Sequence, residues 1–100
     1  MAKFIVLYTQ PKDKEGFEKY YQETHMPLVR QIPNIKGASV SYVVNTQNAE
    51  ADFHLIAELE FEDVQVLQAS MSSAEGKKVQ EDAINIVPFL HKPPMVLITK

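Results

Sequence analysis

Residues 3–8 read Lys-Phe-Ile-Val-Leu-Tyr, and this stretch decides the fold. From Phe4 onward the residues are β-branched, aromatic or otherwise apolar, so both faces of a strand formed here would be apolar. This pattern is typical of a central strand that is covered on two faces. Helices of the same chain can cover one of these faces, and the other face needs a further layer. The remaining sequence is therefore interpreted outward from a buried central strand.

The segments that follow alternate between helical and strand periodicity, which predicts the order β-α-β-β-α-β. This order indicates a ferredoxin-like α+β fold, with a four-stranded antiparallel sheet in a single domain over residues 1–100. Further strands are expected at residues 38–45, 53–61 and 95–99. Helices are expected at about 14–31 with Asp13 as the N-cap, after an Asp63 cap, and after the capping box Ser72-Ser73-Ala74-Glu75.

Several strands are apolar on both faces, but the two crossover helices can cover only one face of the sheet. An exposed apolar sheet face is a liability unless another surface covers it. The simplest cover is a second copy of the same sheet, so we expect a homodimer with two sheets packed face to face.

Composition excludes several classes of function. The chain has no cysteine, which removes disulfides, thiol nucleophiles and thiolate metal sites. Its formal net charge is -3 and it has no run of Lys or Arg, so a nucleic-acid partner is not expected. The longest early apolar run, Phe4 to Tyr8, is too short for a signal peptide or a membrane span. The expected location is therefore the cytoplasm, with no membrane partner.

The first helix carries an apolar stripe and a proline near its end. With no N–H, Pro27 removes the hydrogen bond to the Glu23 carbonyl, so the helix must kink or end there. At helical spacing His25 falls on the edge of the stripe, beside Tyr21. A kink can turn its ring toward a cleft. The stripe comprises Phe17, Tyr20, Tyr21, Thr24, Leu28 and Ile32.

His25 is the main candidate for chemistry, because imidazole exchanges protons at physiological pH. It is interpreted as a general acid or base, or as a hydrogen-bond anchor for a ligand; the alternative is a structural histidine that binds a stray carbonyl at the kink. An aromatic pocket for a flat apolar ligand is a second hypothesis, with core packing as its alternative. Its residues are Tyr8, Tyr20, Tyr21, Tyr42 and Phe53.

Two other histidines have structural interpretations. Alternation along strand 53–61 places His54 on the face of Glu58 and Glu60, and His91 is expected to be solvated. No histidine spacing typical of a metal site occurs, and no nucleotide-binding, flavin or G-x-S-x-G motif is present. We therefore expect neither a metal nor an organic cofactor.

Several motifs together resemble the EthD family. They are Leu7-Tyr8, Phe17-x-x-Tyr20-Tyr21-x-x-Thr24-His25-x-Pro27-Leu28, Pro33-x-x-x-Gly37, Ile56-Ala57-Glu58-Leu59-x-Phe61, and Ser72-Ser73-Ala74-Glu75-Gly76, in which Ala74 stands where proline is usual. The resemblance covers most of the chain and implies a dimeric α+β barrel. Carried over by position, it implies a site at His25, with Tyr20, Thr24 and Pro27 shaping its surroundings.

What the resemblance implies about function is broad. The family is named for a protein of ethyl tert-butyl ether degradation whose founding member accompanies a cytochrome-type monooxygenase. Fungal relatives are linked to dehydration or decarboxylation in aromatic polyketide pathways. The wider superfamily includes cofactor-free quinone-forming monooxygenases, a muconolactone isomerase and haem-handling proteins. Fold-level analogy of this kind does not fix the function.

Three functional hypotheses follow. The first is an enzyme without a cofactor that acts on a hydrophobic aromatic or cyclic small molecule, with His25 moving a proton in oxygenation, dehydration or isomerisation. The second is a non-catalytic accessory protein that binds such a pathway intermediate. The third is haem binding, with His25 as the axial ligand.

Overall fold

The computed structural model describes residues 1–100, and its elements follow the predicted order. They are β1 (Ala2–Thr9), α1 (Lys14–Tyr20), the π-helical turn η1 (Tyr21–His25), α2 (Met26–Val29), β2 (Gly37–Tyr42), β3 (Phe53–Phe61), α3 (Val64–Met71), α4 (Ala74–Ile86), the 3-10 turn η2 (Val87–Phe89) and β4 (Met95–Thr99). None of the helices combines the length and apolar character that crossing a membrane requires.

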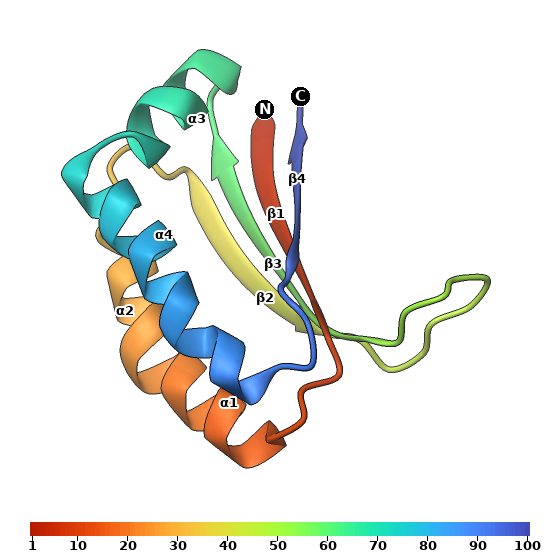
Figure 1. Ribbon diagram of the computed structural model, residues 1–100. Coiled ribbons are helices and arrows are strands. Elements are labelled where there is room, and N and C mark those ends of the chain that lie inside the picture. Colours follow the sequence, from red (N-terminus) through yellow and green to blue (C-terminus); the bar gives the residue numbers. More distant parts are fainter.

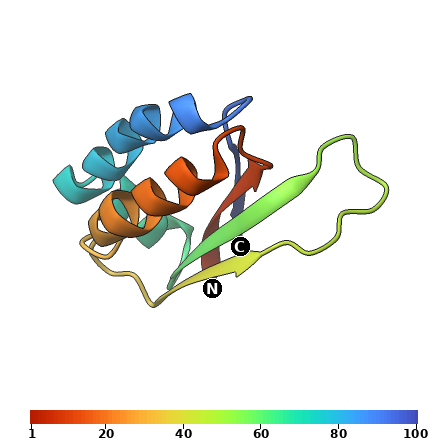
Figure 2. The same ribbon diagram turned by 90° about the horizontal axis from the view of Figure 1, so that it is seen from below.

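The four strands form one antiparallel sheet in the order β2-β3-β1-β4. All the helices lie on one side of this sheet (Figure 1). The ferredoxin-like α+β fold with a four-stranded antiparallel sheet is therefore confirmed. The second strand is shorter than predicted, because it ends at Tyr42. The chain from there to β3 extends away from the body as a loop (Figures 1 and 2).

The register of β1 decides which side chains meet the helices. Val6 lies between Ala57 of β3 and Val96 of β4, and these three residues share the helix side of the sheet. Side chains alternate along each strand, so the neighbours of these three residues in sequence point to the other side of the sheet. Figure 2 shows no helix or strand covering that side. We call this second surface the open face. Its apolar residues are Ile5, Leu7, Ile56, Met95 and Leu97.

Side-chain caps fix the starts of the helices. The predicted N-caps Asp13 and Asp63 are confirmed, since their carboxylates accept hydrogen bonds from Gly16 N–H and Val66 N–H at 3.0 and 2.8 Å. The predicted capping box is displaced by one residue: Ser73 is the N-cap of α4, and its hydroxyl accepts from Gly76 N–H at 3.1 Å.

The first helix neither breaks nor stops before Pro27. It widens into η1, in which Met26 N–H donates to the Tyr21 carbonyl, one residue further back than in an α-helix. The helix then continues through Pro27 to Val29. The extra residue in this turn changes which side chains of the helix face the sheet. His25 and Met26 are therefore buried, while Thr24 is exposed. The predicted place of Thr24 on the inner stripe is therefore wrong.

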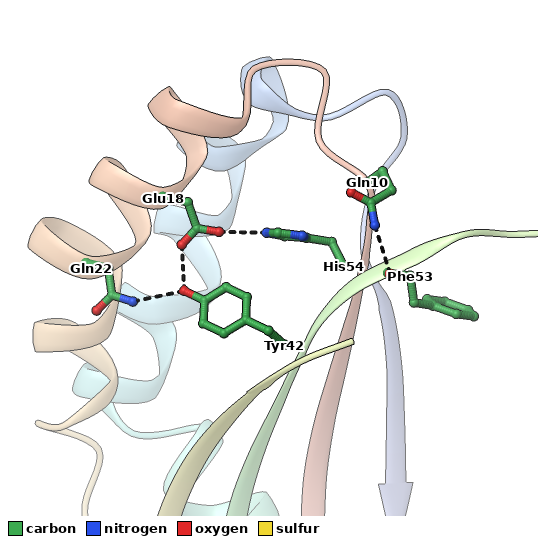
Figure 3. Close-up of polar contacts among 6 residues, drawn as sticks. All are labelled: Gln10, Glu18, Gln22, Tyr42, Phe53 and His54. Carbon is green, nitrogen blue, oxygen red and sulfur yellow. Dashed lines mark hydrogen bonds and ion pairs between the residues drawn. The ribbon is translucent and has the colours of Figure 1, made fainter. Parts of the chain in front are cut away.

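A β-bulge corrects the predicted face of His54. Tyr8 pairs with Leu55, but Thr9 pairs with Phe53, so β3 carries one extra residue at His54. Such a bulge breaks the alternation of side chains. As a result, His54 points to the helix side and not to the face of Glu58 and Glu60 (Figure 3).

Candidate functional site

The π-helical turn places His25 in the interior between the first helix and α4. Its imidazole is buried, with 6% of the residue exposed, and it stacks on the ring of Tyr21 at a centroid distance of 5.4 Å. Nδ1 of His25 lies 2.9 Å from Oδ2 of Asp82. This contact joins η1 to α4 across 57 positions of sequence.

Asp82 is itself buried and its two oxygens have different partners. Oδ1 accepts hydrogen bonds from the Tyr20 hydroxyl at 2.5 Å and from Asn85 Nδ2 at 3.1 Å, while Oδ2 faces His25. Burial alone raises the pKa of this carboxyl, but the hydrogen bonds from Tyr20, His25 and Asn85 outweigh burial and hold the pKa below the usual range of aspartate. Asp82 is therefore ionised at neutral pH.

An ionised Asp82 also decides the tautomer of His25. A carboxylate can only accept, so Nδ1 must carry the proton in this contact. In the neutral ring, Nε2 then has a free lone pair. Neutral His25 is thus arranged as a proton acceptor at Nε2, and the imidazolium that forms after proton transfer faces a negative charge.

His25 opens onto an apolar cavity of about 300 Å³ between α4 and the β1–β4 edge of the sheet. Val79 and Ala83 of α4 form one wall, and Phe4 and Val6 of β1 form the opposite wall. The remaining lining residues are Tyr8, Met71, Gln80, Pro94 and Val96. This volume lies at the lower end of the range of small-molecule sites.

Two buried residues of the lining, His25 and Tyr8, carry polar atoms that are available to a ligand. Neither His25 Nε2 nor the Tyr8 hydroxyl has a hydrogen-bond partner within the chain. Both atoms keep some exposed surface, because Ser70 Oγ is the one fully enclosed side-chain atom that lacks a partner. Burial, together with the nearby charge of Asp82, raises the pKa of the Tyr8 hydroxyl. Tyr8 therefore stays protonated and can donate a hydrogen bond into the cavity.

The other predicted site residues on the first helix have different places. Tyr21 lies beneath the cavity, where it packs between Tyr8 and His25 at centroid distances of 5.5 and 5.4 Å. Tyr20 reaches Asp82 and does not line the cavity. Thr24 is exposed. The structure thus brings Tyr8, Tyr21 and Tyr20 around the His25–Asp82 pair and leaves Thr24 outside.

Tyr42 and Phe53 do not join this site. Figure 3 shows Tyr42 pointing at Glu18 of α1, and its hydroxyl donates to Glu18 Oε2 at 2.6 Å. Phe53 points away from α1, and its carbonyl accepts from Gln10 Nε2 at 3.0 Å (Figure 3). The single aromatic pocket predicted from the sequence is therefore wrong for these two residues: the bulge after Phe53 and the edge position of β2 separate them from His25.

A second polar cluster forms where α1 meets β2 and β3. His54 Nε2 lies 2.6 Å from Glu18 Oε1, and the Tyr42 hydroxyl that donates to Glu18 accepts from Gln22 Nε2 at 3.2 Å (Figure 3). The ring of His54 also meets Phe17 edge-on. His54 is thus paired with a carboxylate, as His25 is, but it lies among packed side chains.

Sequence reasoning missed Asp82 and Asn85. Neither residue is among the candidates named from the sequence, yet Asp82 lies on the inner stripe of Val79, Ala83 and Ile86. A carboxylate at a buried position of an amphipathic helix was the available signal, because such a charge needs a partner. No group of three or more His, Cys, Asp or Glu side chains is arranged to hold a metal ion, and His91 is exposed.

Comparison with known proteins gives one family. A family model described as EthD domain matches residues 9–89. An uncharacterised 11.0 kDa protein of the thcB-thcC intergenic region of Rhodococcus erythropolis is 27% identical over 85 residues, which are 85% of this chain and 82% of that protein.

Solved structures agree with the family model. A crystal structure of an EthD family protein from Bacillus halodurans C-125 is 36% identical, with a TM-score of 0.87 over 100% of this chain and 97% of that one. A dimeric ferredoxin-like protein of unknown function from Jannaschia sp. CCS1 is 11% identical, with a TM-score of 0.70 over 100% and 99% of the two chains, a likeness of fold alone.

Proposed function

Because the chain belongs to the EthD family, we propose that it binds a small hydrophobic molecule beside His25 and moves a proton on that molecule without a cofactor. The observation that supports this proposal is the position of His25 between a buried carboxylate and an apolar cavity. Nδ1 contacts Asp82 at 2.9 Å, and the ring borders the cavity of about 300 Å³. This is the arrangement of a general base that is oriented from behind.

The cavity favours a neutral cyclic or aromatic ligand. Its walls are mostly aliphatic and aromatic, and no Lys or Arg is among the lining residues. An anionic ligand would find no cation there and would lie close to the charge of Asp82. A neutral ring with one carbonyl or hydroxyl group can instead bury its apolar part and present the oxygen to Tyr8.

The proposed step is an enolisation. Nε2 of His25 takes a proton from a carbon next to a ligand carbonyl, and the resulting imidazolium is stabilised by Asp82. The electron pair of the broken C–H bond moves to the carbonyl oxygen, which accepts a hydrogen bond from Tyr8. Return of the proton to another carbon gives isomerisation, and its transfer to a departing hydroxyl gives dehydration. Reaction of the enolate with dioxygen, as a second substrate, would give oxygenation.

A homodimer is the second part of the proposal. The open face carries Ile5, Leu7, Ile56, Met95 and Leu97, and Met95 and Leu97 are 39% and 49% exposed. A patch of this kind on a chain of 100 residues favours burial against another surface. A twofold arrangement lets the same patch cover itself. The dimeric protein of the same fold from Jannaschia sp. CCS1 supports this part.

The test is hydrogen–deuterium exchange at the acidic carbon of β-tetralone, a neutral two-ring ketone, followed by proton NMR. We expect the protein to accelerate exchange, and His25→Gln to reduce the acceleration by roughly 100-fold or more. His54→Gln is the matched control, because it also removes a buried histidine that contacts a carboxylate. We expect it to retain the acceleration.

Two outcomes favour other functions. Tight binding of β-tetralone without exchange, in the wild-type protein and in His25→Gln alike, would leave a non-catalytic binding protein. A haemin complex whose Soret band is lost in His25→Gln but kept in His54→Gln would favour haem binding.

A further inference from the structure

We propose that Tyr20 is a positioning residue, which holds the Asp82 carboxylate so that His25 keeps its proton on Nδ1 and its lone pair toward the cavity. Tyr20 does not line the cavity and would not touch a ligand there. The inference rests on the proposed role of His25 and extends it to Tyr20, which lies five residues earlier on the same continuous helix.

The geometry of Asp82 carries the inference. A carboxylate turns easily about its terminal bond, because that torsion is broad. Here both oxygens are occupied: Oδ1 accepts from Tyr20 at 2.5 Å and from Asn85 at 3.1 Å, which leaves Oδ2 directed at His25. Without the Tyr20 hydroxyl, only the Asn85 amide would hold Oδ1 in place.

Tyr20 is well anchored for this task. Its ring lies 5.9 Å from that of Phe89, so α1 and the segment after α4 fix the direction of the hydroxyl. The hydroxyl therefore links α1 to α4 at the point where η1 presents His25. The hydrogen bond to Asp82, with partial burial, raises the pKa of Tyr20, so its proton stays available for donation.

Other charged groups near Asp82 are few and lie outward. Lys78 and Glu81 share with Asp82 and Asn85 a surface depression of about 270 Å³. On the inner side the titratable neighbours are His25 and the Tyr8 hydroxyl. None of these is altered by removing the Tyr20 hydroxyl, so the effect of that change is attributable to one hydrogen bond.

The second cluster supplies a matched comparison within the same molecule. Glu18 accepts from the Tyr42 hydroxyl at 2.6 Å and contacts His54 at 2.6 Å, so it repeats the grouping of tyrosine, carboxylate and histidine. Tyr42→Phe therefore removes the same kind of hydrogen bond away from the cavity. It should leave His25 and Asp82 unchanged.

The experiment compares Tyr20→Phe and Tyr42→Phe with the wild-type protein by NMR. Imidazole nitrogen and carbon chemical shifts report the tautomer of His25, and the side-chain carboxyl carbon reports the titration of Asp82. We expect wild type and Tyr42→Phe to hold almost all neutral His25 as the Nδ1–H form. In Tyr20→Phe we expect a clearly larger share of Nε2–H, and an Asp82 acid midpoint at higher pH.

An unchanged tautomer and an unchanged Asp82 midpoint in folded Tyr20→Phe would overturn the inference, as would an equal shift in Tyr42→Phe. If Tyr20→Phe does not fold, difluorotyrosine at position 20 gives the opposite change, because its phenol is a stronger donor. We then expect the Asp82 midpoint to move to lower pH, and an unmoved midpoint would overturn the inference.

The NMR measurements need no ligand, so this inference and the proposed function can fail separately. If neither the wild-type protein nor the variants accelerate exchange in β-tetralone, only the proposed reaction is contradicted. If the reaction is present, Tyr20→Phe should slow exchange about 10-fold at saturating ketone with little change in KM, because it misaligns the base without touching the ligand.

Discussion

At the scale of single residues, the two buried histidines each contact a carboxylate but lie in different surroundings. His25 contacts Asp82 at 2.9 Å, and His54 contacts Glu18 at 2.6 Å. What differs is the surroundings of the ring: His25 borders a cavity, whereas His54 meets Phe17 and Tyr42 edge-on. The environment, and not the residue type, separates the two.

The buried tyrosines predict how stability depends on alkaline pH. Burial raises the pKa of the Tyr8 and Tyr21 hydroxyls above the usual tyrosine value. The charge of Asp82 adds to this effect at Tyr8, and the neighbouring Tyr8 adds to it at Tyr21. The folded state therefore binds protons more tightly than the unfolded state. The tyrosines leave the free energy of unfolding unchanged below the unfolded pKa of about 10. Above that pH the free energy of unfolding falls, by up to about 1.4 kcal/mol per pH unit for each tyrosine.

Urea unfolding between pH 8 and pH 12 measures this effect. Tyr21→Phe keeps the ring that stacks on His25 and removes one ionisable group, so we expect its free energy of unfolding to fall less steeply above about pH 10. Parallel curves for the variant and the wild-type protein would contradict the assignment of this loss to Tyr21.

At the scale of elements, the π-helical turn places His25 beside Asp82 and the apolar cavity. An α-helical register would have placed Thr24 on the inner stripe and His25 at its edge, as the sequence pattern predicts. The additional residue per turn buries His25 and Met26 instead. Wide turns of this kind are frequent at functional sites. The absence of an N–H at Pro27 favours the wide turn, because the preceding α-helical hydrogen bond cannot form.

Replacement of Pro27 tests this explanation. Pro27→Ala restores a donor for the Glu23 carbonyl, so we expect a straighter helix, a smaller share of the wide turn and a displaced His25. The ring-current shift that Tyr21 imposes on the His25 ring protons should decrease, and the His25 titration measured by NMR should change. A His25 titration identical to that of the wild-type protein would count against the role of Pro27.

At the scale of the whole molecule, the sheet has one covered and one uncovered side. The helix side holds a continuous core that includes Phe17, Leu55 and Phe61, each with no exposed surface. The open face, in contrast, presents Leu97 at 49% exposure beside Ile5 of the neighbouring strand. A single layer of helices cannot cover both sides, so the second layer must come from another molecule or the patch stays in water.

The proposed dimer is tested by placing one charge in the open face. Leu97→Lys should produce a monomer by size-exclusion chromatography with light scattering, because the interface would then bury an unpaired charge from each protomer. Ile84→Lys is the matched control: Ile84 is 73% exposed on α4, away from the open face, and its replacement should leave a dimer. A monomeric wild-type protein, or dimers of both variants, would contradict the proposal.

Much of the fold was predictable, because its determinants are local. The strands at 53–61 and 95–99 were predicted with their observed bounds, and Asp13 and Asp63 were predicted as caps. The candidate site was predictable only in part. His25 and Tyr8 are both named as candidates, in separate hypotheses. Asp82 is missed, and Thr24, Tyr42 and Phe53 are expected in places where the structure does not put them.

The sequence by itself determined the ferredoxin-like fold, the family and the choice of His25, because apolar periodicity, caps and prolines act over a few residues. Only the tertiary structure decided that His25 meets Asp82, that Tyr20 reaches the same carboxylate, and that His54 turns toward α1. These contacts join residues 57, 62 and 36 positions apart. The placement of His25 depends on one extra residue in a helical turn and that of His54 on one in a strand, which a regular periodicity does not encode.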